Sequence, residues 1–292
     1  MTTPTVQDIA MAAAVIIGAG FVMLLLLALI PNIRRKSLDL VVTLLSATLI
    51  LICLLALFLL GPQALIAGLT LAAARIGYEV ATLRLAKETH VILAALAAAG
   101  LTVISALFTP VAIACAGLWF LLFARQLAAR GTSSNAAVDV LLFPILPMAL
   151  LAYGAAHPEL TALMLAAYVL VEIFDSFALL IGSLLGRTKA FPILSPNKTI
   201  EGLAGGAMAL VIALVVAATI WGFSPLKAAA TALLVGALAV AGDLTASRHK
   251  RIAGVKDYPR VLARQGGLLD SLDSWIAASA GLVAVHFLTA LW

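Results

Sequence analysis

Residues 226–251 read LKAAATALLVGALAVAGDLTASRHKR. An apolar run long enough to span a bilayer ends here at Asp243 and passes directly into a polar stretch that continues to Asp273. The polar stretch, residues 242–273, holds four of the 13 acidic residues and six of the 18 basic residues of the chain. In an otherwise apolar protein, so many charges indicate a charged partner at the membrane surface.

The rest of the chain repeats the apolar pattern. Of its 292 residues, 64% are hydrophobic and only 11% are charged, whereas a soluble domain carries about a quarter charged residues. Ten apolar segments follow one another, at about 9–30, 38–61, 64–82, 91–108, 110–128, 137–155, 160–185, 200–222, 226–243 and 270–291. Continuous apolar runs favour helices over barrel strands, which alternate. We therefore expect an all-α fold, a polytopic membrane helical bundle with about ten transmembrane segments.

The positive charges predict how the segments alternate across the membrane. Seventeen of the 18 Lys and Arg residues lie in or beside the odd-numbered connections, and only Lys227 lies on the other side. Cytoplasmic connections carry an excess of Lys and Arg, so we expect these connections in the cytosol and both termini outside. The chain then divides into N-terminal transmembrane helices, 1–155, and a C-terminal transmembrane region, 156–292, with cytoplasmic loops 186–199 and 244–269, in which we expect the functional site. The expected location is a bacterial inner membrane.

Three carboxylates are candidate metal ligands. Asp270 and Asp273 are three residues apart and therefore share one helical face, and Asp243 closes the preceding segment at the same membrane face. Converging carboxylates suit Mg²⁺, which prefers oxygen ligands. For Asp270 the alternative is capping of the helix that begins there. A second cation is possible, and the number of metals stays open.

Basic residues and glycines accompany these acids. The basic residues are Lys250, Arg251 and Lys256. Phosphoryl chemistry combines metals that bridge phosphate oxygens with Lys and Arg side chains that neutralise the remaining charge. Gly266 and Gly267 are expected to let the backbone approach a ligand closely, and His249 is expected to line the loop. The residues alone therefore point to a nucleoside triphosphate with metal ions.

A second polar connection offers a phosphate-binding candidate. It reads Ser195-Pro196-Asn197-Lys198-Thr199-Ile200-Glu201-Gly202. Ser, Lys and Thr side chains before a helix start suit an anion, because free N–H groups and the helix dipole favour it. The alternative is a proline-containing turn in which Thr199 is the N-cap and Glu201 lies in the first helical turn.

Acidic residues inside apolar segments are costly and therefore functional candidates. Glu79 follows Arg75 by four residues, and an intrahelical ion pair is the alternative to a function. Glu172 and Asp175 share one helical face and could bind metal, pair with a base or be protonated. Asp139 lies near a segment end, where we expect it to be solvated.

At these motifs the chain resembles the phosphatidate cytidylyltransferase family, the CDP-diacylglycerol synthases. The residues that match the family signature are Gly242, Asp243, Leu244, Ser247, Lys250, Arg251, Lys256, Asp257, Gly266, Gly267, Asp270 and Asp273. The connection from Ser195 to Gly202 matches as well, and Asp175, Ala178 and Gly182 are similar to the family's acidic helix.

The resemblance implies transfer of CMP from CTP to phosphatidic acid or a related lipid phosphate, with release of pyrophosphate. It implies catalytic roles for Asp243, Lys250, Arg251, Lys256, Asp257 and Asp270, substrate contacts by Asp175, Ser195, Lys198, Thr199, Glu201, Ser247, Gly266 and Gly267, and metal ligation by Asp243, Asp270 and Asp273. It also implies a homodimer in contact with membrane lipids. The few aromatic residues give no surface for nucleic acid.

The chain departs from the family signature in three places, and other functions stay open. Gln265 replaces the family's His, and Ala263-Arg264 replaces the Pro-Gly before it. Ser271 replaces the Arg between the last two aspartates, and Leu179 replaces the aromatic residue that follows the alanine of the acidic helix. These changes predict a divergent member, with the same reaction or another lipid phosphate as acceptor. The alternatives are a non-catalytic relative of the enzyme and a transporter or flippase with Glu79, Glu172 and Asp175 as its ion path.

Overall fold

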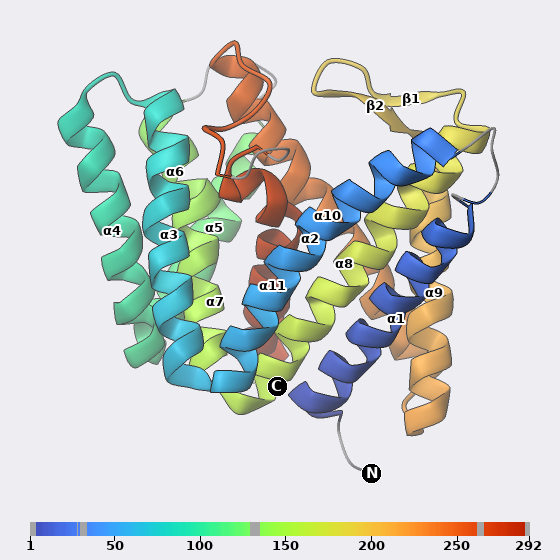
Figure 1. Ribbon diagram of the computed structural model, residues 1–292. Helices are drawn as coiled ribbons and strands as arrows, with labels where there is room; N and C mark the ends of the chain where they lie inside the picture. Colours follow the sequence, from blue (N-terminus) through green and yellow to red (C-terminus); the bar gives the residue numbers. More distant parts are fainter. Residues whose placement is uncertain (1–3, 28, 30–33, 129–134, 262–265, 290–292) are drawn as a thin grey trace.

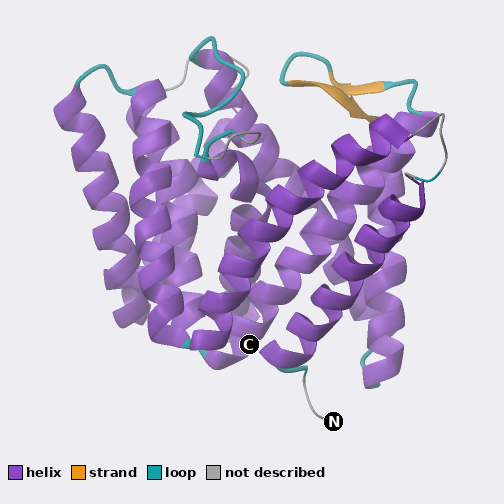
Figure 2. Ribbon diagram, viewed as in Figure 1, coloured by secondary structure: helices purple, strands orange, loops and turns teal. Residues whose placement is uncertain are grey.

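The computed structural model describes residues 4–27, 29, 34–128, 135–261 and 266–289, and most of them lie in helices (Figures 1 and 2). The elements in chain order are α1 (Val6–Leu27), α2 (Arg34–Leu60), α3 (Pro62–Arg84), α4 (Glu88–Leu107), α5 (Thr109–Ala128), α6 (Ala136–Val140), η1 (Leu141–Ile145), α7 (Leu146–Ala156), α8 (Pro158–Leu185), β1 (Lys189–Phe191), β2 (Ser195–Thr199), α9 (Ile200–Trp221), α10 (Pro225–Ile252) and α11 (Leu268–Thr289). The helices stand side by side as one bundle (Figure 1).

Each of the ten predicted apolar segments coincides with a helix, and the sixth coincides with α6, η1 and α7 together. Eight described helical stretches are long and apolar enough to cross a membrane: α3, α4, α5, the joined α6–η1–α7, α8, α9, α10 and α11. Among their described residues, α1 and α2 add the shorter apolar stretches Val6–Gly18 and Thr48–Leu59. The expected all-α polytopic fold is therefore confirmed.

The sixth segment is interrupted at its middle. Phe143 leaves the helical conformation, with φ −156° and ψ 113°, and Pro144 follows it. A proline offers no backbone N–H to a helix and disturbs the turn before it. The chain resumes as α7, which lies with α11 at the centre of the bundle. In the most apolar 18-residue stretch of the joined span α6–η1–α7, and in that of α11, 78% of the residues are buried, as expected for helices that are apolar on every side.

Small residues bring the C-terminal helices close together. A Cβ atom on Gly202 of α9 would lie 2.6 Å from the carbonyl oxygen of Ala178 in α8. A Cβ atom on Gly242 of α10 would lie 2.5 Å from the carbonyl oxygen of Asp273 in α11. Helices in membranes commonly approach through such small residues. The contact at Gly242 places the neighbouring Asp243 close to the start of α11.

The polar connections gather at one end of the bundle. Figure 1 shows the β1–β2 hairpin, the α3–α4 connection and the loop after α10 at the top, whereas α1 begins and α11 ends at the bottom. This arrangement fits the alternation that the positive charges predict. Arg130 and Arg264, which contribute to that count, and Gln265 lie outside the described residues.

Two predicted loops are partly wrong. The expected loop 244–269 begins later, because α10 continues as a helix to Ile252. Its polar last turns are stabilised by cations near the helix C-terminus and by ion pairs with other helices. The expected loop 186–199 contains an antiparallel hairpin in which Lys189 pairs with Thr199 and Phe191 with Ser195. This two-stranded sheet is a small addition to the all-α fold.

Candidate active site

Lys198 lies at the centre of the first of two charged groups. It is near the end of β2, and its Nζ lies 2.8 Å from Oδ2 of Asp243 on α10. The carboxylates of Asp175 on α8 and Asp273 on α11 also act on this ammonium group. Burial by itself would lower the pKa of Lys198, but Asp243, Asp175 and Asp273 outweigh it and hold the pKa above its ordinary value. Four elements thus bring three predicted acids to one cation.

The hairpin that carries Lys198 is fixed at the start of α9. Thr199 is the N-cap, and its Oγ1 accepts a hydrogen bond from the backbone N–H of Gly202 at 3.1 Å. The carboxylate of Glu201 accepts hydrogen bonds from the backbone N–H of Arg187 at 3.1 Å and from Oγ1 of Thr188 at 2.9 Å. The predicted alternative of an N-cap with an acid in the first turn is confirmed. These two residues hold the hairpin in place, and Ser195 lies half-buried at its other end.

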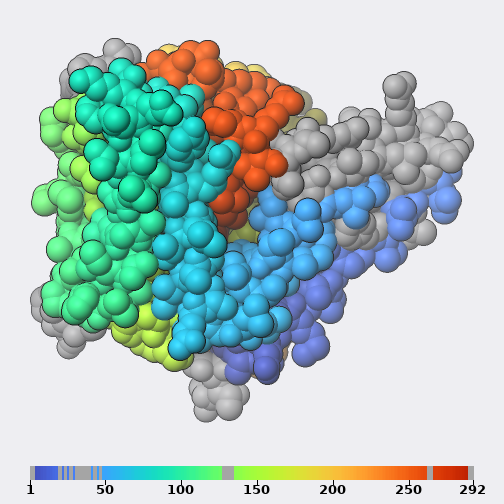
Figure 3. Space-filling model, turned by 60° about the vertical axis from the view of Figure 1, so that its left-hand side comes forward, coloured from blue at the N-terminus to red at the C-terminus, as the bar shows by residue number. Residues whose placement is uncertain are grey.

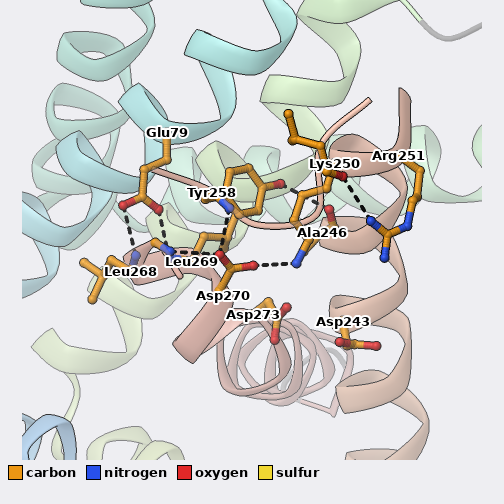
Figure 4. Close-up of polar contacts among 12 residues, drawn as sticks. Glu79, Asp243, Ala246, Lys250, Arg251, Tyr258, Leu268, Leu269, Asp270 and Asp273 are labelled. Atoms are coloured by element: carbon orange, nitrogen blue, oxygen red, sulfur yellow. Dashed lines mark hydrogen bonds and ion pairs between the residues drawn. The ribbon is translucent and has the colours of Figure 1, made fainter. Parts of the chain in front are cut away.

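Asp270 is the centre of the second charged group (Figure 4). Its Oδ1 accepts a hydrogen bond from Nζ of Lys250, and its Oδ2 accepts the backbone N–H groups of Tyr258 and Gly267, each at 2.8 Å. Asp270 is the third residue of α11, and its side chain accepts the backbone N–H of Gly267, the residue just before the helix. This contact is one half of a capping box. The predicted alternative of helix capping is therefore confirmed. Both oxygens of this candidate metal ligand are occupied by donors of the protein.

Tyr258 anchors the loop between α10 and α11. Its ring is almost fully buried under Lys250, whose Nζ lies 5.4 Å from the ring centroid. Its hydroxyl donates a hydrogen bond to the carbonyl oxygen of Ala246 at 3.2 Å. Burial and then the charges of Asp270 and Asp273 raise the pKa of this hydroxyl, so it stays neutral. Sequence reasoning missed Tyr258, although an aromatic residue within a charged loop is a recognisable signal.

The two glycines before α11 leave room for side chains of the protein itself. A Cβ atom on Gly266 would lie 2.0 Å from Oδ2 of Asp270, and one on Gly267 would lie 2.5 Å from Oε2 of Glu79. Only residues without a side chain permit these approaches. In this structure the two glycines therefore allow the carboxylates of Asp270 and Glu79 to approach the backbone closely. From the sequence we expect a bound ligand, not protein side chains, at this place.

The remaining predicted residues lie around these two groups. Ser247 is buried on α10, and Arg251 donates from Nη1 to the carbonyl oxygen of Val255 at 3.0 Å. Lys256 and Asp257 are exposed in the loop. The expectation that His249 lines the loop is wrong, because His249 is fully buried within α10. Its position follows from the length of α10.

Asp139 contradicts the expectation of a solvated residue. It is buried on α6, and its Oδ2 accepts a hydrogen bond from Nε of Arg84 at 3.0 Å. Its Oδ1 accepts one from Nη1 of Arg248 at 3.3 Å and lies 4.0 Å from Nε2 of His249. This buried cluster joins α3, α6 and α10. Its members are up to 165 residues apart in the chain (Arg84 and His249), so sequence spacing gives no signal for it.

Glu79, one of the three residues of the predicted ion path, is held by contacts within the protein. Glu79 forms the predicted ion pair with Arg75, with Nε and Oε1 2.9 Å apart, which confirms that alternative. It also accepts hydrogen bonds from the start of α11. Glu172 is exposed on α8, whereas Asp175 faces Lys198. The carboxylate of Glu79 is occupied by protein donors, so Glu79 does not serve as the ion-binding residue that the transporter hypothesis requires.

No three His, Cys, Asp or Glu side chains lie close enough to hold a metal within the described part of the chain. Mg²⁺ does not require such a cage, since it is commonly held by one or two carboxylates together with water and substrate phosphates. Asp243 lies 2.8 Å from Lys198, and Asp273 acts electrostatically on the same cation, so these two carboxylates are the candidates for holding a divalent cation. Asp270 fits less well, because Lys250 and two backbone N–H groups use its oxygens.

Comparisons with known proteins agree with the family resemblance of the sequence. The model of the cytidylyltransferase family matches residues 41–290. The phosphatidate cytidylyltransferase of Staphylococcus saprophyticus is 38% identical over 117 residues, which cover 38% of this chain and 44% of that protein. The uncharacterized protein YnbB of Escherichia coli is 40% identical over 115 residues, 39% of each chain. The phosphatidate cytidylyltransferase of Staphylococcus aureus is 36% identical over 114 residues, with 38% of this chain and 44% of that protein covered. The matched part spans less than half the length of these relatives.

Proposed function

This chain belongs to the cytidylyltransferase family, and on that premise we propose that it transfers CMP from CTP to the phosphate of phosphatidic acid or a related lipid phosphate. An oxygen of the lipid phosphate forms a bond to the α-phosphorus of CTP. The bond between the α-phosphorus and the bridging oxygen of the β-phosphate breaks, and pyrophosphate leaves with that electron pair. A phosphate monoester is largely ionised at neutral pH, so the attack requires no protein base.

The charge arrangement around Lys198 is the observation that best supports this proposal. A triphosphate and a lipid phosphate together bring several negative charges to one place. Lys198 offers one positive charge for them, at the end of the bundle where α8, α10 and α11 place carboxylates that would hold a divalent cation. Lys250 provides a second buried cation, oriented by Asp270. Preorganised cations of this kind stabilise the charge that develops during phosphoryl transfer.

A divalent cation, Mg²⁺, belongs to the proposal. Asp243 and Asp273 would hold it, and it would supply positive charge that offsets the negative charge of the phosphates. Lys198 would then leave its ion pair with Asp243 and turn toward the phosphates of CTP. Arg251, Lys256 and Asp257, at the exposed rim, would contact the outer phosphates or the nucleoside.

The proposed site faces the cytosol, where CTP is available, at the surface of a bacterial inner membrane. The positive charges favour this orientation, and the hairpin and the loop after α10 share one end of the bundle (Figure 1). The lipid acceptor would enter from the surrounding bilayer. The homodimer that the family resemblance implies is part of the proposal and is testable by cross-linking in membranes.

The activity is tested with purified protein, Mg²⁺, CTP labelled in its α-phosphate and a panel of lipid phosphates. We expect label in a CDP-lipid with phosphatidic acid or one of its relatives. Excess EDTA should reduce the product to background, and excess Mg²⁺ should restore it. A comparison of CTP with dCTP measures the nucleotide preference. Absence of labelled lipid with every acceptor would contradict the proposal and favour a non-catalytic relative.

A further inference from the structure

Glu79 binds the beginning of α11 from a different helix. Its side chain, on α3, is completely buried. Its Oε1 accepts the backbone N–H of Leu268 at 2.9 Å, and its Oε2 accepts that of Leu269 at 3.0 Å (Figure 4). These are the first two residues of α11, whose N–H groups have no partner within the helix. One carboxylate therefore satisfies both groups.

Arg75 extends this contact to the loop. Its Nε donates to Oε1 of Glu79 at 2.9 Å, and its Nη2 donates to the carbonyl oxygen of Pro259 at 3.1 Å. We call Arg75 and Glu79 the α3 clamp. The clamp holds the loop at Pro259 and the start of α11 at once. Figure 3 shows the orange surface, formed by the end of α10 and the loop after it, beside the surface of α3.

The clamp connects directly to the second charged group. Gly267 lies between the two carboxylates, because its N–H binds Asp270 and its missing side chain makes room for Glu79. Any shift in the first turn of α11 therefore moves the carboxylate of Asp270. Asp270 in turn orients Lys250, and Asp273 lies one turn further along the same helix.

We propose that Glu79 is a positioning residue for the transferase site, acting through the first turn of α11 on Asp270 and Lys250. The inference rests on the proposed function. Glu79 does not contact substrate, since protein groups surround both of its oxygens. It fixes the distance between the cation of Lys250 and the carboxylates of α11 while CTP binds and leaves.

The first test is kinetic. Glu79→Gln retains the size of the side chain but leaves one acceptor oxygen for three donors. We expect kcat to fall about 10–100-fold, the range known for residues that orient a site from behind. The KM for CTP should change less than about threefold. Glu159→Gln, which removes an exposed carboxylate in the first turn of α8, is the matched control and should keep wild-type activity.

A double variant separates positioning from general destabilisation. If Glu79 acts through Asp270, the variant with both Glu79→Gln and Asp270→Asn should be as active as Asp270→Asn alone, within about twofold. Multiplied losses would overturn the proposal, because they would mean that Glu79 acts independently of Asp270. Arg75→Met should give a smaller loss than Glu79→Gln, since it spares both backbone N–H contacts.

Hydrogen exchange tests the clamp without reference to activity. In Glu79→Gln, amide exchange should become at least about tenfold faster in a peptide covering residues 266–272 and stay unchanged in peptides of α8 and α9. Unchanged exchange at 266–272 would overturn the clamp. If the wild-type protein makes no CDP-lipid from any acceptor, the proposed function fails, whereas faster exchange in the variant still supports the contact between α3 and α11.

Discussion

The residues of the candidate site come from distant parts of the chain, and their pairing depends on the fold. The sequence singles out Lys198 and Asp243 separately, each within a motif. It does not predict that they form an ion pair, because 45 residues, including the whole of α9, separate them. Conversely, Asp270 is predicted both as a metal ligand and as a cap, and only the contact with Lys250 and the loop distinguishes these roles. Local spacing predicts which residues carry chemistry, and tertiary packing decides their partners.

At this scale the first prediction concerns Lys198. Lys198→Met removes the cation that pairs with Asp243 and on which Asp175 and Asp273 also act. We expect kcat/KM for CTP to fall by about 100-fold, comparable to the loss of one preorganised electrostatic group. Lys227→Met, at an exposed position in the first turn of α10, should change it less than twofold. Equal effects of the two variants in steady-state assays would contradict the assignment.

A second prediction at the residue scale concerns the buried cluster around Asp139. Asp139→Asn leaves Arg84 and Arg248 facing a neutral group in a buried site. Breaking a buried ion pair costs about 3–5 kcal/mol of unfolding free energy, so Tm in detergent should fall clearly. The exposed variant Glu159→Gln should leave Tm unchanged. A Tm for Asp139→Asn equal to that of the control would show that the cluster does not stabilise the fold.

At the scale of elements, the apolar runs predict the helices and their order, because each run has the length of a membrane span. The ends of elements depend on contacts outside the run. The last turns of α10 are polar and resemble a loop in sequence, yet ion pairs of Arg248 and Lys250 with other helices keep them helical. The hairpin β1–β2 could not be predicted either, since its strands are short and their residues do not alternate between apolar and polar. The interruption at Phe143 has a visible signal in Pro144.

The close contact of α10 with α11 leads to a third prediction. In Gly242→Ala the new Cβ would lie 2.5 Å from the carbonyl oxygen of Asp273 and 2.6 Å from Cβ of Ala277. The helices must separate, at a cost of about 1–3 kcal/mol for overpacking, and the activity should fall with the displacement of Asp243. Thermal unfolding and the transfer assay measure the two effects.

Gly236→Ala is the control for this variant on the same helix. Its Cβ would meet the ring of Phe174 at 3.4 Å, an ordinary contact. Alanine is also the better helix former by about 1 kcal/mol. We therefore expect Tm to stay equal or rise slightly. A loss of stability as large as that of Gly242→Ala would refute the proposed role of the close helix contact.

For the whole molecule, the charge asymmetry and the position of the polar connections agree. The sequence predicts one strongly basic side, and the structure gathers the hairpin and the loop after α10 at one end (Figure 1). The central position of α7 and α11 could not be predicted, because all ten segments are apolar and the pattern does not distinguish lipid contact from helix contact. Burial of these two spans follows from packing of the assembled bundle.

The orientation in the membrane gives a fourth prediction. Lys256→Cys and Glu159→Cys place single thiols at opposite ends of the bundle, in a chain whose Cys53 and Cys115 are replaced. A membrane-impermeant maleimide should label Glu159→Cys in intact bacterial cells whose outer membrane has been permeabilised. It should label Lys256→Cys only after the inner membrane has been opened. Labelling of both thiols from outside would contradict the proposed topology.

The central claim is that nucleotidyl transfer to a lipid phosphate occurs at the charged group around Lys198 and Asp243. The most direct measurement is incorporation of label from the α-phosphate of CTP into lipid by wild-type protein and by Asp243→Asn, each confirmed as folded by its Tm. The account predicts CDP-lipid from the wild type and a loss of at least about 100-fold in Asp243→Asn, consistent with removal of a group that stabilises the transition state. Undiminished CDP-lipid formation by folded Asp243→Asn would contradict it.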